Sequence, residues 1–300
     1  MLDSLAPTSP ITAPAPGRRR DRRRSYRRLR RAPVTVAVAL LIVVEVAPLL
    51  WLLLSSFKTQ AEFVNEPAWS LPHSFALDNY REAWTTGRVG AYVLNSVLAT
   101  VPSLALIVLL GVAAGFALEV LVWRGRHQVL LVFLVGIMVP SQMILLPLFR
   151  VYFQAGLSGT LWPLIVTYTA TGLPLTVFMM ATYFRAIPRQ VFEAATMDGA
   201  SVLRSFVSVG FPLARNAVFT VALVQFFFIW NDLLIALTFT TDDDLRTIQV
   251  GLLNFTGQYG ETAFGPLFAA ISVNVVGTFL LYLFINQRIM QGLTDGSVKG

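Results

Sequence analysis

The 300-residue sequence has no cysteine, only two histidines, and few charged residues, at 13%. Without cysteine the chain forms no disulfide bond and no thiolate metal site. Neither His73 nor His127 has a second metal ligand at a useful spacing, so we expect no metal site. The GxxxxGK[ST] loop that cradles nucleotide phosphates and the GxSxG motif of many hydrolases are also missing from the sequence. These absences favour a chain that is not itself an enzyme.

Apolar residues dominate what is present: 55% of the chain is hydrophobic and the mean hydropathy is +0.66. Soluble domains are closer to half apolar and one quarter charged. Six runs are long enough to cross about 30 Å of hydrocarbon. They lie at about 33–54, 91–118, 129–152, 161–184, 213–239 and 264–286. The sequence therefore predicts an all-α integral membrane protein, with a domain over 33–300 built from six helices, several of them kinked by proline.

Residues 1–32 are rich in proline and arginine, with ten arginines between Arg18 and Arg31. Such a composition buries little apolar surface and predicts a disordered tail. A nucleic-acid-binding arm and a cleaved signal peptide are two alternatives. The run at 33–54 is too long for a typical signal peptide and no A-x-A cleavage site follows it. We therefore expect a signal-anchor helix with its basic end in the cytoplasm and no nucleic-acid partner.

The distribution of basic residues predicts the topology. The tail, the loops at 122–128 and 185–215, and the C-terminus hold 18 of the 23 lysines and arginines. The intervening segments hold only five, which are Lys58, Arg81, Arg88, Arg150 and Arg246. By the positive-inside rule, both termini and the 185–215 loop face the cytoplasm of a multi-pass protein in the lipid bilayer.

The polar segment 185–212 separates two of the apolar runs. Pro188 suits the start of a short helix, and Asp198-Gly199 suits its end. Val191, Ala194 and Ala195 fall on one face of that helix. Ser201 is a candidate N-cap for a second short helix, whose amphipathic stripe is Val202, Leu203, Phe206 and Val207. This pattern indicates two short helices joined by a glycine corner and shaped to fit a partner's groove. The alternative is an ordinary amphipathic loop between two spans.

This segment resembles the EAA motif of ABC importer permeases. The match consists of Glu193-Ala194-Ala195, then Gly199, then Val209 and Phe211-Pro212. Other stretches resemble the second, maltose-type permease subunit of carbohydrate importers, over about residues 34–300. They are Met138–Gln142 with Leu146–Leu148, Gly156-Leu157, Trp230–Asp232 and the ending GLTDGSVKG. One departure is Gly277-Thr278, where such proteins often have a proline midway along the last span.

The resemblance implies a permease subunit of an ATP-driven, binding-protein-dependent importer for a sugar or oligosaccharide, in a bacterial cytoplasmic (inner) membrane. Its partners would be a homologous second permease subunit, two ATPase subunits and an extracytoplasmic solute-binding protein. ATP and Mg would bind to the ATPase subunits, with no cofactor in this chain. The implied ATPase-coupling residues are Glu193, Ala194, Ala195, Met197, Asp198, Gly199, Ala200 and Ser201.

Polar residues within the spans are candidates for the translocation path: Gln225, Trp230, Asn231, Asp232 and Asn274. A carboxylate at mid-bilayer costs about 2.5–3.5 kcal/mol, so Asp232 should face the bundle or water. Its alternative role is to cap or pair structurally near the outer interface, and interhelical hydrogen bonds alone would explain Gln225 and Asn274. In the outer loop at 240–263, Gly257, Gln258, Tyr259 and Gly260 are candidates for binding-protein contact, or part of a solvated connection.

Two functions other than a permease make predictions that the sequence can check. A secondary transporter or channel working alone should bring ionisable residues together at mid-membrane and contain inverted repeats, and no clear repeat is visible in the sequence. An intramembrane enzyme needs a Ser/His or metal pair within the spans, and neither histidine lies in an apolar run.

The topology is testable with reporters fused along the chain. Reporters at the N-terminus and at residue 125 should read cytoplasmic, and reporters at residues 75 and 255 should read outside, because the basic loops stay in the cytoplasm. Any other pattern contradicts the six-span assignment.

Overall fold

The computed structural model describes residues 18–257 and 261–297, with side chains for 34–257 and 261–283. The chain divides into two compact units, residues 1–52 and residues 53–300. Helix is the dominant element, and among the described residues the only β-type pairing is an isolated bridge between Thr256 and Thr262.

The first unit consists mainly of helix α1 (Arg18–Ser55), which contains the apolar run Val34–Ser55. The sequence predicts a disordered tail through residue 32, whereas in the structure α1 begins at Arg18. Arginine is a good helix former, and a segment that extends an existing helix avoids the cost of nucleation. The part of the tail before Arg18 lies outside the described residues.

The second unit is a bundle of long helices, α4 (Val89–Glu119), α7 (Trp162–Ala186), α10 (Phe211–Trp230) and α13 (Phe264–Ser297). Helices α4 and α7 pack closely because α4 presents glycines to α7. A Cβ added to Gly111 would lie 2.3 Å from Thr176 Cγ2, and one added to Gly115 would lie 2.6 Å from Met180 Cβ. Small residues allow this approach in membrane bundles, where packing replaces the hydrophobic effect.

The run expected as one span at 129–152 forms two helices, α5 (Arg126–Met138) and α6 (Ser141–Gln154), which meet at 96°. Pro140 lacks an N–H, and Val139 before it is extended with ψ 115°. The sequence predicted a kink here, but the bend is sharper than a kink. The described residues contain five helices that can cross a membrane, or six if this bent pair counts as one span.

The fifth span also differs from the expected range of 213–239. It starts earlier, because α9 (Val202–Ser205), the π-helical turn η1 (Phe206–Gly210) and α10 form one continuous run over Val202–Trp230. It ends earlier too, since α11 (Leu234–Phe239) is a separate helix. The Asp232 carboxylate accepts a hydrogen bond from the Ala236 N–H at 3.0 Å, which starts the new helix.

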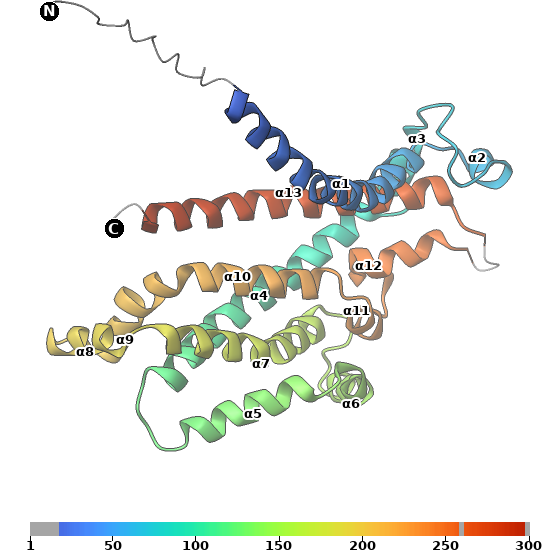
Figure 1. The fold of residues 1–300 in the computed structure, drawn as a ribbon. Coiled ribbons are helices and arrows are strands. Elements are labelled where there is room, and N and C mark those ends of the chain that lie inside the picture. Colours follow the sequence, from blue (N-terminus) through green and yellow to red (C-terminus); the bar gives the residue numbers. More distant parts are fainter. Residues whose placement is uncertain (1–17, 258–260, 298–300) are drawn as a thin grey trace, which may run out of the picture. The chain divides into compact units, whose positions relative to one another are not determined.

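The remaining elements lie at the two ends of the bundle (Figure 1). One end carries α8 (Arg189–Met197) and α9. The other carries α2 (Gln60–Asn65), α3 (Asp78–Thr85) and the segment with η2 (Asp243–Leu245), α12 (Ile248–Gly251) and η3 (Leu252–Phe255). We call these the α8 end and the α2 end.

The close α4–α7 contact gives a stability prediction. Gly115→Ala should lower the free energy of unfolding by about 1–3 kcal/mol, because the added methyl overpacks Met180. Thermal unfolding of purified protein in detergent measures this. Gly277→Ala is the matched control, since a Cβ there has no atom within 4 Å. Equal melting temperatures for Gly115→Ala and the control would contradict the packing argument.

Candidate functional site

The segment 188–205 folds as two short helices around a glycine corner. Helix α8 ends in a Schellman motif: Gly199 N–H donates to the Thr196 carbonyl at 3.0 Å, and Ala200 N–H donates to the Ala195 carbonyl at 3.0 Å. Gly199 has φ +77°, the left-handed conformation expected for a glycine just after a helix. Ser201 Oγ then accepts the N–H of Arg204 at 3.3 Å and caps α9. Both sequence predictions for this corner are confirmed.

Helix α8 is anchored to the bundle by a side chain outside the face of Val191, Ala194 and Ala195. Val191 and Ala194 are exposed, while Phe192 is buried with 7% exposure. Phe192 packs edge-on against Phe116 of α4, with ring centroids 5.7 Å apart. One large aromatic ring therefore fastens α8 to α4, while Val191 and Ala194 stay open to a partner. The sequence reasoning missed Phe192 and its partner Phe116.

The outer surface of the corner is apolar and exposed. Met197 is 87% exposed and Leu203 is 71% exposed. Glu193 and Asp198 are exposed beside them. A groove of about 620 Å³ runs between α8, α9 and the end of α4, and is lined by residues such as Phe192, Glu193 and Met197. Large exposed apolar side chains rimmed by polar ones mark an interaction surface.

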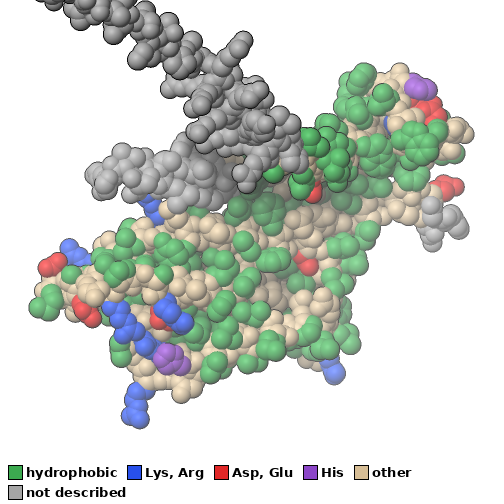
Figure 2. Space-filling view, viewed as in Figure 1, with side chains coloured by type: hydrophobic (Ala, Val, Ile, Leu, Met, Phe, Trp, Pro, Cys, Tyr) green, Lys and Arg blue, Asp and Glu red, His purple; other side chains and the backbone are tan. Residues whose placement is uncertain are grey.

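Basic residues gather at this α8 end. Figure 2 shows most of the visible Lys and Arg side chains there, over α8, α9 and the start of α5. An ion pair between Arg185 and Glu119 (3.0 Å) joins the ends of α7 and α4. The arrangement agrees with the charge asymmetry in the sequence.

A second candidate site is a cavity of about 470 Å³ between the α5–α6 break, α7 and α10. Gln225 and Asp232 both line it, together with Tyr168 and Ser141. Buried Gln225 donates from Nε2 to the Gly172 carbonyl and to Thr176 Oγ1, both at 3.0 Å. Tyr168 donates its hydroxyl to Asp232 Oδ2 at 2.9 Å. Structural hydrogen bonds and a position on the cavity wall therefore coexist at Gln225 and Asp232.

The other path candidates lie elsewhere. Trp230 Nε1 donates to Asn274 Oδ1 at 3.0 Å, which joins α10 to α13. Asn231 is exposed and donates to the Phe227 carbonyl of its own helix at 3.0 Å. None of these three residues lines the cavity that holds Gln225 and Asp232.

Polar contacts hold the α2 end together. Asp243 pairs with Arg88 at 2.7 Å and accepts hydrogen bonds from Tyr92 and Asn254. Partial burial opposes ionisation of Asp243, but these hydrogen bonds and the nearby arginines outweigh it and lower its pKa. Arg88 adopts φ +54°, rare for a residue with a side chain, and this ion pair holds it there.

The candidate contact loop begins beside this network. Gly257 donates its N–H to the Glu261 carbonyl at 2.6 Å and lines an outer cleft of about 610 Å³. Gln60 of α2 anchors the loop, donating to the Thr262 carbonyl at 2.8 Å and accepting from the Phe264 N–H at 2.9 Å. Gln258, Tyr259 and Gly260 lie outside the described residues.

Residues 85–290 match the family described as the binding-protein-dependent transport system inner membrane component. The chain belongs to this family. It is thus an ABC importer permease of the binding-protein-dependent type, and the resemblance to carbohydrate-type permeases is confirmed. With several apolar helices, it is a multi-pass membrane protein.

Permease subunits of two other transporters align with most of this chain. The chain is 37% identical over 268 residues to the diacetylchitobiose uptake system permease protein NgcG of Streptomyces coelicolor, covering 88% of each chain. It is 29% identical over 276 residues to the trehalose/maltose transport system permease protein MalG of Thermococcus litoralis, covering 91% of this chain and 98% of that protein. These relatives are transporter subunits, not catalytic ones.

The fold also matches a solved structure. A chain from the crystal structure of a bacterial ABC transporter involved in the import of the acidic polysaccharide alginate superposes with a TM-score of 0.74 at 19% identity. The match covers 93% of the permease and 99% of that chain. The all-α membrane bundle predicted from the sequence is therefore confirmed.

Substitutions at Asp232 distinguish a role in the translocation path from a purely structural role. Asp232→Asn removes the charge but keeps an oxygen that accepts from Tyr168 and Ala236, so assembly and melting temperature should stay unchanged. Asp232→Ala removes the acceptor and should destabilise the protein by about 1–3 kcal/mol.

If Asp232 lines the path, Asp232→Asn should alter the transport rate or solute preference of the assembled transporter. Transport assays in proteoliposomes, with thermal unfolding in parallel, measure both effects. Wild-type transport by a normally assembled Asp232→Asn permease would contradict a path role.

Proposed function

We propose that this permease is one half of the translocation path of an importer for a sugar or oligosaccharide. It would pair with a homologous permease subunit, bind two ATPase subunits that carry ATP and Mg, and receive solute from an extracytoplasmic binding protein. The named relatives, which include diacetylchitobiose and trehalose/maltose permeases, support the substrate class. Both termini would lie in the cytoplasm.

The observation that carries the proposal is the geometry of the EAA-like segment. Its glycine corner lies at the basic end of the bundle, with Met197 and Leu203 exposed around it. Exposed carboxylates on Glu193 and Asp198 offer ion pairs to a partner. An apolar tip with a polar rim has the composition of a protein interface, and we assign it to the ATPase subunits.

A movement at this tip would reach the middle of the bundle through one helix. The continuous run Val202–Trp230 has 29 residues, or about 40 Å at about 1.5 Å per residue. It begins with α9, contains Gln225 and ends just before Asp232. Closure of the ATPase subunits on ATP would therefore move the wall of the cavity in which we place the translocation path.

The binding protein would dock at the α2 end. The residues that flank 258–260 are held in place by Gln60 and by the Thr256–Thr262 bridge. A loop whose two ends are fixed, and which lies beside the outer cleft, is suited to contact the binding protein. Gly257, Gln258, Tyr259 and Gly260 are the proposed contacts.

Gly199→Val tests the coupling assignment. A β-branched side chain at φ +77° costs about 1–3 kcal/mol and redirects α9. The variant should insert into the membrane and bind the partner permease, because the spans keep their backbone hydrogen bonds. It should lose ATPase subunits on copurification, or lose solute-stimulated hydrolysis.

Gly156→Val is the matched control. Gly156 has φ +68° and, as at Gly199, an added Cβ would meet nothing within 4 Å, so the backbone strain is similar. The control should keep its ATPase subunits and its hydrolysis. Full ATPase retention and hydrolysis in Gly199→Val would refute the coupling role.

A further inference from the structure

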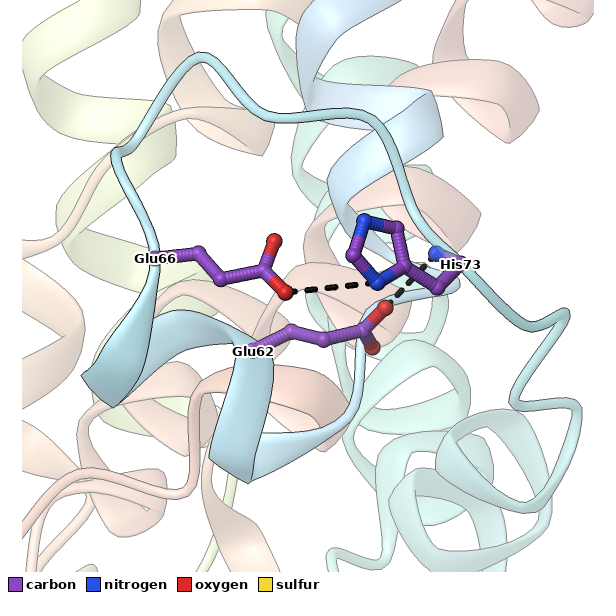
Figure 3. A group of neighbouring side chains, drawn as sticks. All are labelled: Glu62, Glu66 and His73. Atoms are coloured by element: carbon purple, nitrogen blue, oxygen red, sulfur yellow. Dashed lines mark hydrogen bonds and ion pairs between the residues drawn. The ribbon is translucent and has the colours of Figure 1, made fainter.

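Three potential metal ligands meet in the segment before α3. Figure 3 shows Glu62, Glu66 and His73 with their side chains pointing toward one another. Glu62 lies in the first turn of α2 and Glu66 is the residue that ends the helix, four positions further on. The following loop returns and places His73 beside them. The expectation of no metal site rested on known ligand spacings, whereas the loop between Glu66 and His73 brings these three residues together.

Backbone hydrogen bonds hold Glu62 in place. Its Oε2 accepts the N–H of Thr59 at 2.6 Å and the Thr59 hydroxyl at 2.8 Å, in a capping box. Its Oε1 accepts the N–H of His73 at 2.6 Å. The bonds from Thr59 and His73 lower the pKa of Glu62 to about 2, so the carboxylate is ionised at neutral pH.

One acceptor position on Glu62 remains open. A carboxylate has about four lone-pair sites, and the three hydrogen bonds use one on Oε1 and two on Oε2. The free site is on Oε1, the atom that also fixes the backbone of His73. Glu62 is nine-tenths buried, so an anion held there gains from a cation beside it.

The other two ligands are already in contact. His73 Nδ1 lies 3.3 Å from Glu66 Oε1. Ligand atoms of all three residues lie within 4.8 Å of one another. Ligands at about 2.0–2.1 Å from a tetrahedral zinc ion lie about 3.3 Å apart, so small side-chain rotations bring the three into range.

We propose that Glu62, Glu66 and His73 bind a divalent transition metal ion of the zinc class. One imidazole nitrogen and two carboxylates form a donor set that suits zinc, whereas magnesium and calcium prefer oxygen ligands alone. The two carboxylates neutralise the ion, and the exposed side of His73 leaves room for water as a fourth ligand. The ion would hold the two ends of the segment 62–73 together. This segment is next to Gln60, which anchors the candidate contact loop.

Metal binding to the complete purified transporter tests this directly. The complex is stripped with a chelator, titrated with zinc, and assayed for bound zinc and for melting temperature. Wild type should bind one zinc ion more per permease than His73→Gln, and its melting temperature should rise with zinc. Glu66→Gln should weaken zinc affinity by at least about tenfold, the range found even for residues that only support a ligand.

His127→Gln is the matched control, because His127 is the only other histidine in the permease. It should bind zinc as wild type does. Glu62 is left unchanged, since its loss would break the capping box, whereas His73→Gln keeps the backbone N–H that Glu62 accepts. Equal zinc binding by wild type and His73→Gln would overturn the proposal and leave the cluster as an ion pair that fastens the loop.

Discussion

The position of the segment 188–205 depends on contacts with the ring of Phe116. The ring packs against Phe184 of α7, Phe192 of α8 and Phe206 of η1, with centroids 5.5, 5.7 and 5.1 Å apart. Each such pair contributes about 0.5–1.5 kcal/mol beyond its buried area. Helices as short as α8 and α9 are not stable alone, so they take their positions from this cluster.

The two ends of the bundle are built with different chemistry. At the α8 end, apolar rings join the segment 188–205 to α4 and α7, and the outer surface stays exposed. At the α2 end, charges and amides such as Arg88, Asp243 and Asn254 tie segments far apart in sequence. Ring packing tolerates small rotations better than a directional hydrogen-bond network does. We therefore assign movement to the α8 end and a fixed platform to the α2 end.

Features that depend on neighbouring residues could be predicted from the sequence. The apolar runs coincide with the five long helices and the bent pair α5–α6. Asp198-Gly199 and Ser201 predicted the corner, because helix ends follow local rules. Features that depend on tertiary contacts could not be predicted. Periodicity did not reveal that Phe192 would be buried, and Arg88 and Asp243 pair across 155 residues. The 96° bend at Pro140 exceeds what a proline alone predicts.

The central claim is that the corner at Gly199 touches the ATPase subunits. The chain has no cysteine, so one introduced cysteine gives a unique attachment point for a photo-activated cross-linker. Met197→Cys, at an 87% exposed position of the corner, should cross-link to an ATPase subunit in the assembled transporter. Trp69→Cys, at an 81% exposed position in the α2–α3 loop, should not. Cross-linking to the ATPase from residue 69 but not from residue 197 would contradict the account.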